Sequence, residues 1–314
     1  SYMFFNHSIS CVITNYNHDK YIKNTIKIVF EQSVKFDQVI IIDDGSNDNS
    51  FKILKLLNKK YKFKLIKNKK NLGINVSFNK ALRHIKTKFL FTMAMDDIYS
   101  KNLVKYFKSS IEKYSKYNPS IILGHAEGTH KNGKKIYQNF GFNKTKYFNK
   151  FEFLNFYSRK PFEVFGGNAF LEVQKTKKFG GYLKDLYWHS DWMLYFLLLI
   201  DNGMVIFPKK IVIRRITNDS YSSNMKNTKY ETKITLNFLK ILGKKFKKKF
   251  KVFKKYSIMP SYHLDLFFLL LKEKRFREYI TLGLIFKILS FNIKKFLTYL
   301  LPAKVKNILK KILL

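Results

Sequence analysis

The sequence predicts an α/β fold, in which an open, mostly parallel sheet with flanking helices is followed by a basic helical region. Three observations predict it. Short apolar runs alternate with segments of helical periodicity over the first half of the chain. The apolar runs end in polar residues, and from about residue 229 Lys mixes with Phe, Leu and Ile at helical spacing. We therefore expect an α/β domain at 1–228, with halves at about 8–125 and 126–228, and a helical region at 229–314.

The first half of the chain reads as four strands separated by helices. Strands are expected at 8–14, 37–43, 63–66 and 89–92, and helices at 21–30, at about 50–59 and around 76–82. Crossovers between parallel strands bring the carboxyl ends of the strands to one edge, where ligands bind in such sheets. Polar clusters end three of these strands: Thr14-Asn15-Tyr16, Asp43-Asp44 and Asp96-Asp97. We expect them to meet at one site.

Net charge and cysteine content indicate the kind of partner and the compartment. The 314 residues carry a net charge of +40, a field that attracts phosphate-rich partners, although an AT-rich genome would also enrich Lys. The single cysteine, Cys11, lies in an apolar run, so we expect a buried, unpaired thiol and a reducing compartment. Neither a signal peptide nor a membrane-spanning helix is expected.

Asp96 and Asp97 follow the fourth apolar run directly. Paired carboxylates at the end of a strand can hold a hard cation such as Mg²⁺ or Mn²⁺ and leave positions open for substrate phosphates. In isolation, a solvated turn that caps a following helix is the better explanation of the pair.

Four segments in this order make the metal interpretation the stronger one. They read ITNYNHDKYI, VIIIDDGSNDNS, NKKNLGINVSFNKAL and FTMAMDDIY. Together they resemble the nucleotide-binding half of a GT-A glycosyltransferase of family 2, over about 8–125 and more weakly to about 220. A dinucleotide-binding domain would instead need G-x-G-x-x-G after its first strand, and that motif is absent.

The resemblance implies a nucleotide site at the first two strand ends. Thr14 and Tyr16 would lie against the uracil, and Asp44 would accept the N–H of the base. Asp43 would help to bind the nucleotide or would brace the loop. Turn formation is the simpler explanation for these residue types alone.

The resemblance also implies a metal site. Asp97 would ligate Mn²⁺ or Mg²⁺, which would bridge the diphosphate of the donor, while Asp96 would face the ribose or waters on the metal. Met95 occupies the first acidic position of the Asp-x-Asp motif of the family.

Further along the chain, Asp191 stands at the start of an apolar helix, where the family carries its catalytic base. A helix N-cap formed by Ser190 or Asp191 is the alternative, and His189 is the second candidate for the base. Arg215 matches an arginine of the family that touches the diphosphate. Thr217 stands where many members have His, and 218–227 resembles a lid over the donor.

The resemblance thus predicts an inverting, metal-dependent hexosyl- or N-acetylhexosaminyltransferase, moving a sugar from a UDP-sugar to a surface polysaccharide, lipooligosaccharide or lipid-linked glycan. The basic amphipathic tail would hold it on an anionic membrane, at the cytoplasmic face of the inner membrane. A helical cap with solvated Lys explains the tail nearly as well. No nucleic-acid partner is expected, and the alternative function is a basic membrane- or nucleic-acid-binding protein without catalysis.

Overall fold

The computed structural model describes residues 7–130, 132–138, 140–159, 167–216 and 228–300. The chain divides into two compact units, 1–224 and 225–314. Each unit is described by itself.

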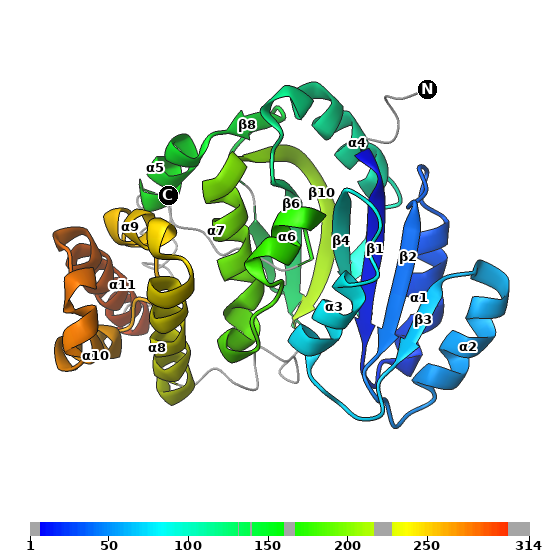
Figure 1. The fold of residues 1–314 in the computed structure, drawn as a ribbon, viewed down its shortest axis with the longest axis horizontal. Coiled ribbons are helices and arrows are strands. Elements are labelled where there is room, and N and C mark those ends of the chain that lie inside the picture. Colours follow the sequence, from blue (N-terminus) through cyan, green and yellow to red (C-terminus); the bar gives the residue numbers. More distant parts are fainter. Residues whose placement is uncertain (1–6, 131, 139, 160–166, 217–227, 301–314) are drawn as a thin grey trace. The chain divides into compact units, whose positions relative to one another are not determined.

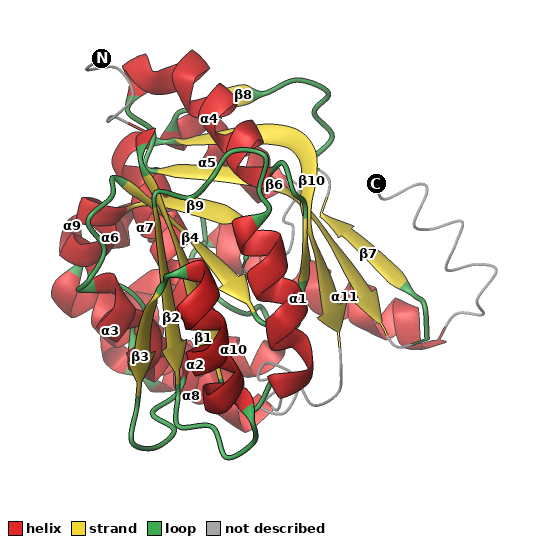
Figure 2. Cartoon of the chain, turned by 90° about the vertical axis from the view of Figure 1, so that its right-hand side faces the viewer, coloured by secondary structure: helices red, strands yellow, loops and turns green. Residues whose placement is uncertain are grey.

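The first unit is built on one mixed sheet. Its strands follow the order β3-β2-β1-β4-β9-β6-β10-β5, with β7 beside β6 and β8 beside β10 (Figure 2). Strands β1 to β4 are parallel to one another, and β6 is parallel to β10. Their bounds are β1 Ile9–Asn15, β2 Gln38–Asp43, β3 Lys64–Lys67, β4 Phe89–Ala94, β5 Ile98–Tyr99, β6 Ile121–His130, β7 Lys135–Gln138, β8 Lys146–Phe148, β9 Ala169–Glu172 and β10 Met204–Ile216.

Helices cover both faces of this sheet (Figure 1). Their bounds are α1 Asp19–Phe30, α2 Ser50–Tyr61, α3 Ile74–Leu82, α4 Leu103–Tyr114, α5 Lys150–Arg159, α6 Val173–Phe179 and α7 Ser190–Asn202, with short 3₁₀ helices η2 Ser115–Tyr117 and η3 Lys184–His189. Alternate β1 residues Ile9, Cys11 and Ile13 share one core with the apolar stripes of α1, α2 and α4. On the other face, Phe78 of α3 stacks on Tyr182, ahead of α7.

The predicted α/β fold class is confirmed, and the four expected strands appear within two residues of their expected ends. Two expectations were wrong. The Asp96-Asp97 pair leads into the short strand β5 instead of a helix. The apolar runs at 205–207 and 210–213 predict two short strands around Pro208, but the structure has one strand, β10. Register shifts beside Lys210 let Pro208 sit where the ladder needs no N–H donor.

The second unit is helical. It contains α8 Thr228–Lys245, α9 Lys247–Lys255, α10 Leu264–Lys272, the 3₁₀ helix η4 Lys274–Tyr279 and α11 Leu282–Leu300. Aromatic side chains hold these helices together. Phe238 contacts Phe253 with ring centroids 5.5 Å apart, and Phe250 contacts Tyr279 at 5.3 Å. Pro260 and Pro302 each predict a break between helices of this region. Pro260 falls between α9 and α10, whereas Pro302 lies outside the described residues.

Two expectations from composition can be compared with the structure. Cys11 is buried and free, and burial raises the pKa of its thiol, which makes it unreactive. Among the described helices, none has the length and hydropathy needed to cross a membrane.

Candidate active site

The turn after β2 is organised by Asp43. This carboxylate is fully buried and accepts hydrogen bonds from Asn15 Nδ2 at 3.0 Å, from Ser46 N at 3.1 Å and from Ser46 Oγ at 2.7 Å. Ser46 Oγ in turn accepts from the N–H of Asn17 at 3.0 Å. Asp43 therefore joins the ends of β1 and β2, which is the bracing role considered from the sequence.

Asp44 holds a second loop against the same edge. Its Oδ1 accepts from Asn68 Nδ2 at 2.8 Å and from Leu72 N at 2.9 Å, and its Oδ2 accepts from Gly73 N at 2.9 Å. The next residue, Gly45, lies directly against this loop, because a Cβ on it would meet the backbone of Lys70 at 2.5 Å. Asp44 thus shapes the loop in front of α3 and keeps one unused lone pair, on Oδ2.

The other two residues expected near the base lie at the end of β1. Thr14 is half-buried and pairs in register with Ile42 of β2 and Ala94 of β4, so it sits between the two acidic strand ends. Tyr16 follows the strand and is 37% exposed, which leaves a face of its ring open for stacking.

Asp96 and Asp97 follow β4 at this edge. Thr25 Oγ1 of α1 holds the backbone just before them by donating to the carbonyl of Met95 at 2.7 Å. Asp96 is half-buried and Asp97 is buried. Asp97 Oδ1 accepts from the N–H of Arg215 at 3.0 Å, and Oδ2 lies 3.9 Å from Arg214 Nε.

The charge of Asp97 is only partly compensated. Burial raises the pKa of Asp97 to about 7, although Arg214 and the Arg215 N–H lower it, and the neighbouring Asp96 raises it further. A buried carboxylate beside a second one supplies hard oxygen donors and favours an added cation. The described residues hold no group of three or more His, Cys, Asp or Glu suited to a metal, so substrate oxygens would have to complete the shell.

Asp191 is the second residue of α7 and is half-buried. Burial raises the pKa of Asp191, while the Trp192 N–H, Arg214 and His189 lower it. The Trp192 N–H donates to Asp191 Oδ1 at 2.7 Å. The N-cap position itself belongs to His189, so the capping alternative for Ser190 or Asp191 was wrong.

Arg214 connects the two acidic sites. Its positive charge lowers the pKa of both Asp97 and Asp191, which places the three groups in one electrostatic environment. The sequence motif had pointed to Arg215 instead. That residue contributes its backbone N–H to Asp97, while its guanidinium lies 4.9 Å from the ring centre of Tyr21. Neighbouring side chains of β10 point to opposite faces of the sheet. Which of the two arginines has its side chain beside Asp97 therefore depends on the register of the strand, and a sequence motif does not give it.

Helix α3 ties the Asp44 loop to the segment before Asp191. Asn75 Nδ2 donates to the carbonyl of Tyr187 at 2.9 Å, and Asn79 brackets Tyr182 by accepting from its N–H at 2.9 Å and donating to its carbonyl at 2.6 Å. Gly181 is required here, because a Cβ would meet Asn79 Oδ1 at 2.1 Å. The expected residues at the ends of β1, β2 and β4 therefore share one sheet edge, and Asp191 is linked to that edge through α3. Thr217 and 218–227 lie outside the described residues.

Tyr187 has a strained backbone in this clamped segment. Its φ of 49° and ψ of −123° suit glycine and cost an L-residue about 1–3 kcal/mol. We expect Tyr187→Gly to be about 1 kcal/mol more stable than Tyr187→Ala in urea unfolding, because only Gly relieves the strain.

The matched control is Tyr137 in β7, an exposed tyrosine outside the positive-φ residues. There Ala should be more stable than Gly. If Ala also proves the more stable replacement at position 187, the strain at Tyr187 is refuted.

The raised pKa of Asp97 predicts a pH dependence of stability. The folded pKa of about 7 exceeds the ordinary value of 3.8, so between these values the folded state holds a proton that the unfolded state has lost. The free energy of unfolding of the metal-free protein should therefore fall by up to about 1.4 kcal/mol per unit as pH rises from about 4 to 7.

Denaturant titrations of the wild type and of Asp97→Asn across this range isolate the effect. As pH rises, Asp97→Asn should become more stable relative to the wild type, and this difference should level off above pH 7. A difference that stays constant from pH 4 to 8 would contradict the assignment.

The fold, with acidic residues at the carboxyl ends of parallel strands, is of the GT-A type. The family model described as "Glycosyl transferase family 2" matches residues 10–173, just over half of the chain. The chain belongs to this family, as its four motifs predicted.

Known proteins show the same likeness over parts of their length. The chain is 36% identical over 104 residues to an uncharacterised glycosyltransferase of Methanocaldococcus jannaschii, covering 32% of this chain and 36% of that protein. It is 30% identical over 133 residues to the minor teichoic acid biosynthesis protein GgaA of Bacillus subtilis, covering 39% of this chain and 30% of that protein. The matches span between 18% and 36% of the length of three such relatives.

Among solved structures, TarS 1–349 of S. aureus in complex with UDP-GlcNAc superposes with a TM-score of 0.58 at 15% identity. The match covers 79% of this chain and 75% of that one. At this identity the likeness shows the fold alone, and it agrees with the GT-A architecture.

Proposed function

We propose that this protein is an inverting, metal-dependent glycosyltransferase that moves a sugar from a UDP-sugar to a surface-glycan or lipid-linked glycan acceptor. One observation supports this most strongly. The charge of Arg214 lowers the pKa of both Asp97, the candidate metal ligand after β4, and Asp191, the candidate base on α7. Donor diphosphate and acceptor hydroxyl must meet in such a place for direct transfer.

The donor would bind across the ends of β1, β2 and β4. Tyr16 offers an exposed ring face to the uracil, and Thr14 lies between the strands beneath it. Asp44 would accept the N–H of the base with a lone pair that its three loop hydrogen bonds leave free. Asp43 would act indirectly, by holding the loop, and Arg215 would have to leave the ring of Tyr21, 4.9 Å from its guanidinium, to reach the diphosphate.

Asp97 and Asp96 would hold Mn²⁺ or Mg²⁺. The fit rests on the chemistry of the two carboxylates and on the raised pKa of Asp97, which marks a buried negative charge that its neighbours do not fully balance. Such a cation supplies a Lewis acid that neutralises negative charge on the departing diphosphate.

Asp191 would act as the base. Its carboxylate would take the proton from the acceptor hydroxyl as that oxygen bonds to the anomeric carbon, while the bond from this carbon to the UDP oxygen breaks. A single displacement from the opposite side inverts the configuration. Because burial raises the pKa of Asp191, its carboxylate is a stronger base than an ordinary aspartate.

The acceptor class and the place of action also belong to this proposal. The likeness to a teichoic acid biosynthesis protein supports a surface-glycan acceptor. The basic helical unit supports action at the cytoplasmic face of the inner membrane, where a lipid-linked acceptor would be carried. In this account 8–125 binds the donor and 126–228 receives the acceptor.

A panel of UDP- and GDP-sugars tests the proposal by thermal shift and by release of the nucleotide diphosphate with Mn²⁺ present. We expect a UDP-sugar to stabilise the protein and to release UDP slowly, even to water. If no nucleotide sugar stabilises it or turns over, the catalytic proposal fails and a basic binding protein remains.

A further inference from the structure

The second unit presents large apolar side chains to solvent on its last helix. Along α11 these side chains recur every three or four residues and are between 38% and 86% exposed. We call them the apolar stripe: Leu282, Phe286, Leu289, Ile293, Phe296 and Leu297. On an α-helix this spacing places them along one face.

The opposite face of α11 already packs on its own unit. Leu284 and Ile288 are buried, and Asn292 Nδ2 donates to the carbonyl of Tyr262 at 3.0 Å. Lys287 Nζ donates to the carbonyl of Tyr256 at 2.7 Å. These contacts fix the rotation of α11 about its axis, so the helix cannot turn to bury the apolar stripe in its own unit without breaking them. Six exposed large apolar residues in one row mark an interaction surface.

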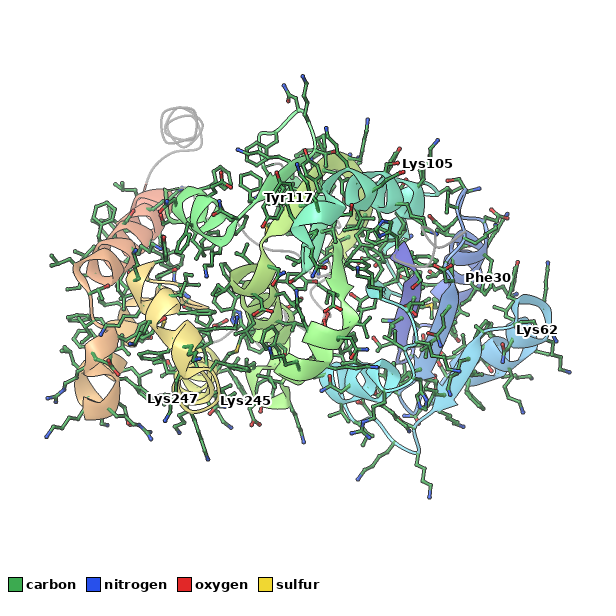
Figure 3. All side chains as sticks on the ribbon, turned by 45° about the horizontal axis from the view of Figure 1, so that its top comes forward. Phe30, Lys62, Lys105, Tyr117, Lys245 and Lys247 are labelled. Carbon is green, nitrogen blue, oxygen red and sulfur yellow. The ribbon has the colours of Figure 1, made fainter. Side chains whose placement is uncertain are left out.

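The unit that carries this surface is strongly basic. Residues 225–314 contain 23 Lys and Arg against four Asp and Glu. In the sequence, exposed Lys272, Lys274 and Arg275 stand between Leu271 of α10 and Leu282, the first residue of the stripe. Arg275 also pairs with Glu273 at 3.2 Å. In Figure 3 the side chains of Lys245 and Lys247 project from the junction of α8 and α9, and both are exposed.

The apolar stripe and the positive charge together indicate which kind of partner binds this unit. A second copy of this unit would bring an equal positive charge against the first, and a nucleic acid would leave the apolar stripe in water. An anionic bilayer meets both requirements, because lipid phosphates pair with Lys and Arg while the acyl boundary accepts Leu, Ile and Phe. We propose that the apolar stripe of α11 inserts into the surface of an anionic membrane, with Lys272, Lys274 and Arg275 on the lipid phosphates. This deepens the proposed function, since it names the surface that would present a lipid-linked acceptor.

Vesicle flotation of the full-length protein tests the proposal. We expect flotation with vesicles of phosphatidylglycerol and phosphatidylcholine, and much less with phosphatidylcholine alone. Combined Leu282→Ser, Phe286→Ser and Ile293→Ser should weaken binding at least tenfold. Combined Lys272→Gln and Lys274→Gln should weaken it about fivefold per charge, on anionic vesicles only.

The matched control is Leu56→Ser, since Leu56 is 57% exposed on α2 of the first unit and should leave flotation unchanged. Circular dichroism checks that each variant is folded. If the triple serine variant floats like the wild type, or if it only converts a dimer to a monomer in light scattering, the membrane proposal is overturned. UDP release measured without vesicles should be equal in all these variants, so loss of membrane binding and loss of catalysis are separately visible.

Discussion

Asp191→Asn is expected to lower turnover about 10²- to 10⁴-fold while leaving the KM for the UDP-sugar nearly unchanged. Asn keeps the side-chain oxygen that accepts from the Trp192 N–H at 2.7 Å, so the start of α7 should be preserved. What it loses is the carboxylate that would take the proton from the acceptor. Initial rates of UDP release, measured against donor concentration with Mn²⁺ present, give both constants.

His189→Asn is the matched control, because His189 is the adjacent N-cap residue and the second candidate for the base. It should cost far less than Asp191→Asn. If His189→Asn abolishes turnover and Asp191→Asn leaves it within a factor of a few, the base is His189.

The second large effect is expected for Asp97→Asn. We predict a fall of about 10²- to 10³-fold in kcat/KM at fixed Mn²⁺, since the variant removes the buried charge that would hold the cation. The fold should persist, because Asn can still accept from the N–H of Arg215, and the variant no longer buries a carboxylate with a pKa raised to about 7. Turnover against Mn²⁺ concentration measures the loss and shows whether more metal restores it.

Asp37→Asn provides the comparison. Asp37 is an exposed carboxylate beside the amino end of β1, where it accepts from the N–H of Ile9 at 2.8 Å, and it should not affect the response to Mn²⁺. Equal responses of the two variants to Mn²⁺ would remove Asp97 from the metal site.

The fold of the first half was predictable because its signals are local. Each buried parallel strand reads as an apolar run that ends in turn residues, as in β2, where Gln38–Asp43 breaks at Asp44 and Gly45. Strand β9 was harder to foresee. Its four residues, Ala169–Glu172, pair antiparallel to both β4 and β6, and nothing in so short a run specifies partners that are distant in sequence.

The candidate site was predictable in its residues but not in its connections. The motifs pointed to Asp97 and Asp191, whereas Arg214, which lies 3.9 Å from Asp97 and whose charge lowers the pKa of both carboxyls, depends on the register of β10. The three hydrogen bonds of Asp44 to Asn68 and the loop before α3 are tertiary contacts that a turn motif does not encode. The strained Tyr187 was also missed, because glycine is the residue type expected at its φ.

Calorimetric titration of UDP into the protein, with and without Mn²⁺, tests the central claim most directly, namely that acidic strand ends bind a nucleotide together with a cation. The account predicts that Mn²⁺ tightens UDP binding at least tenfold in the wild type and in Asp191→Asn, and has no such effect in Asp97→Asn. UDP binding that is equally tight with and without Mn²⁺, or a full Mn²⁺ response in Asp97→Asn, would contradict it.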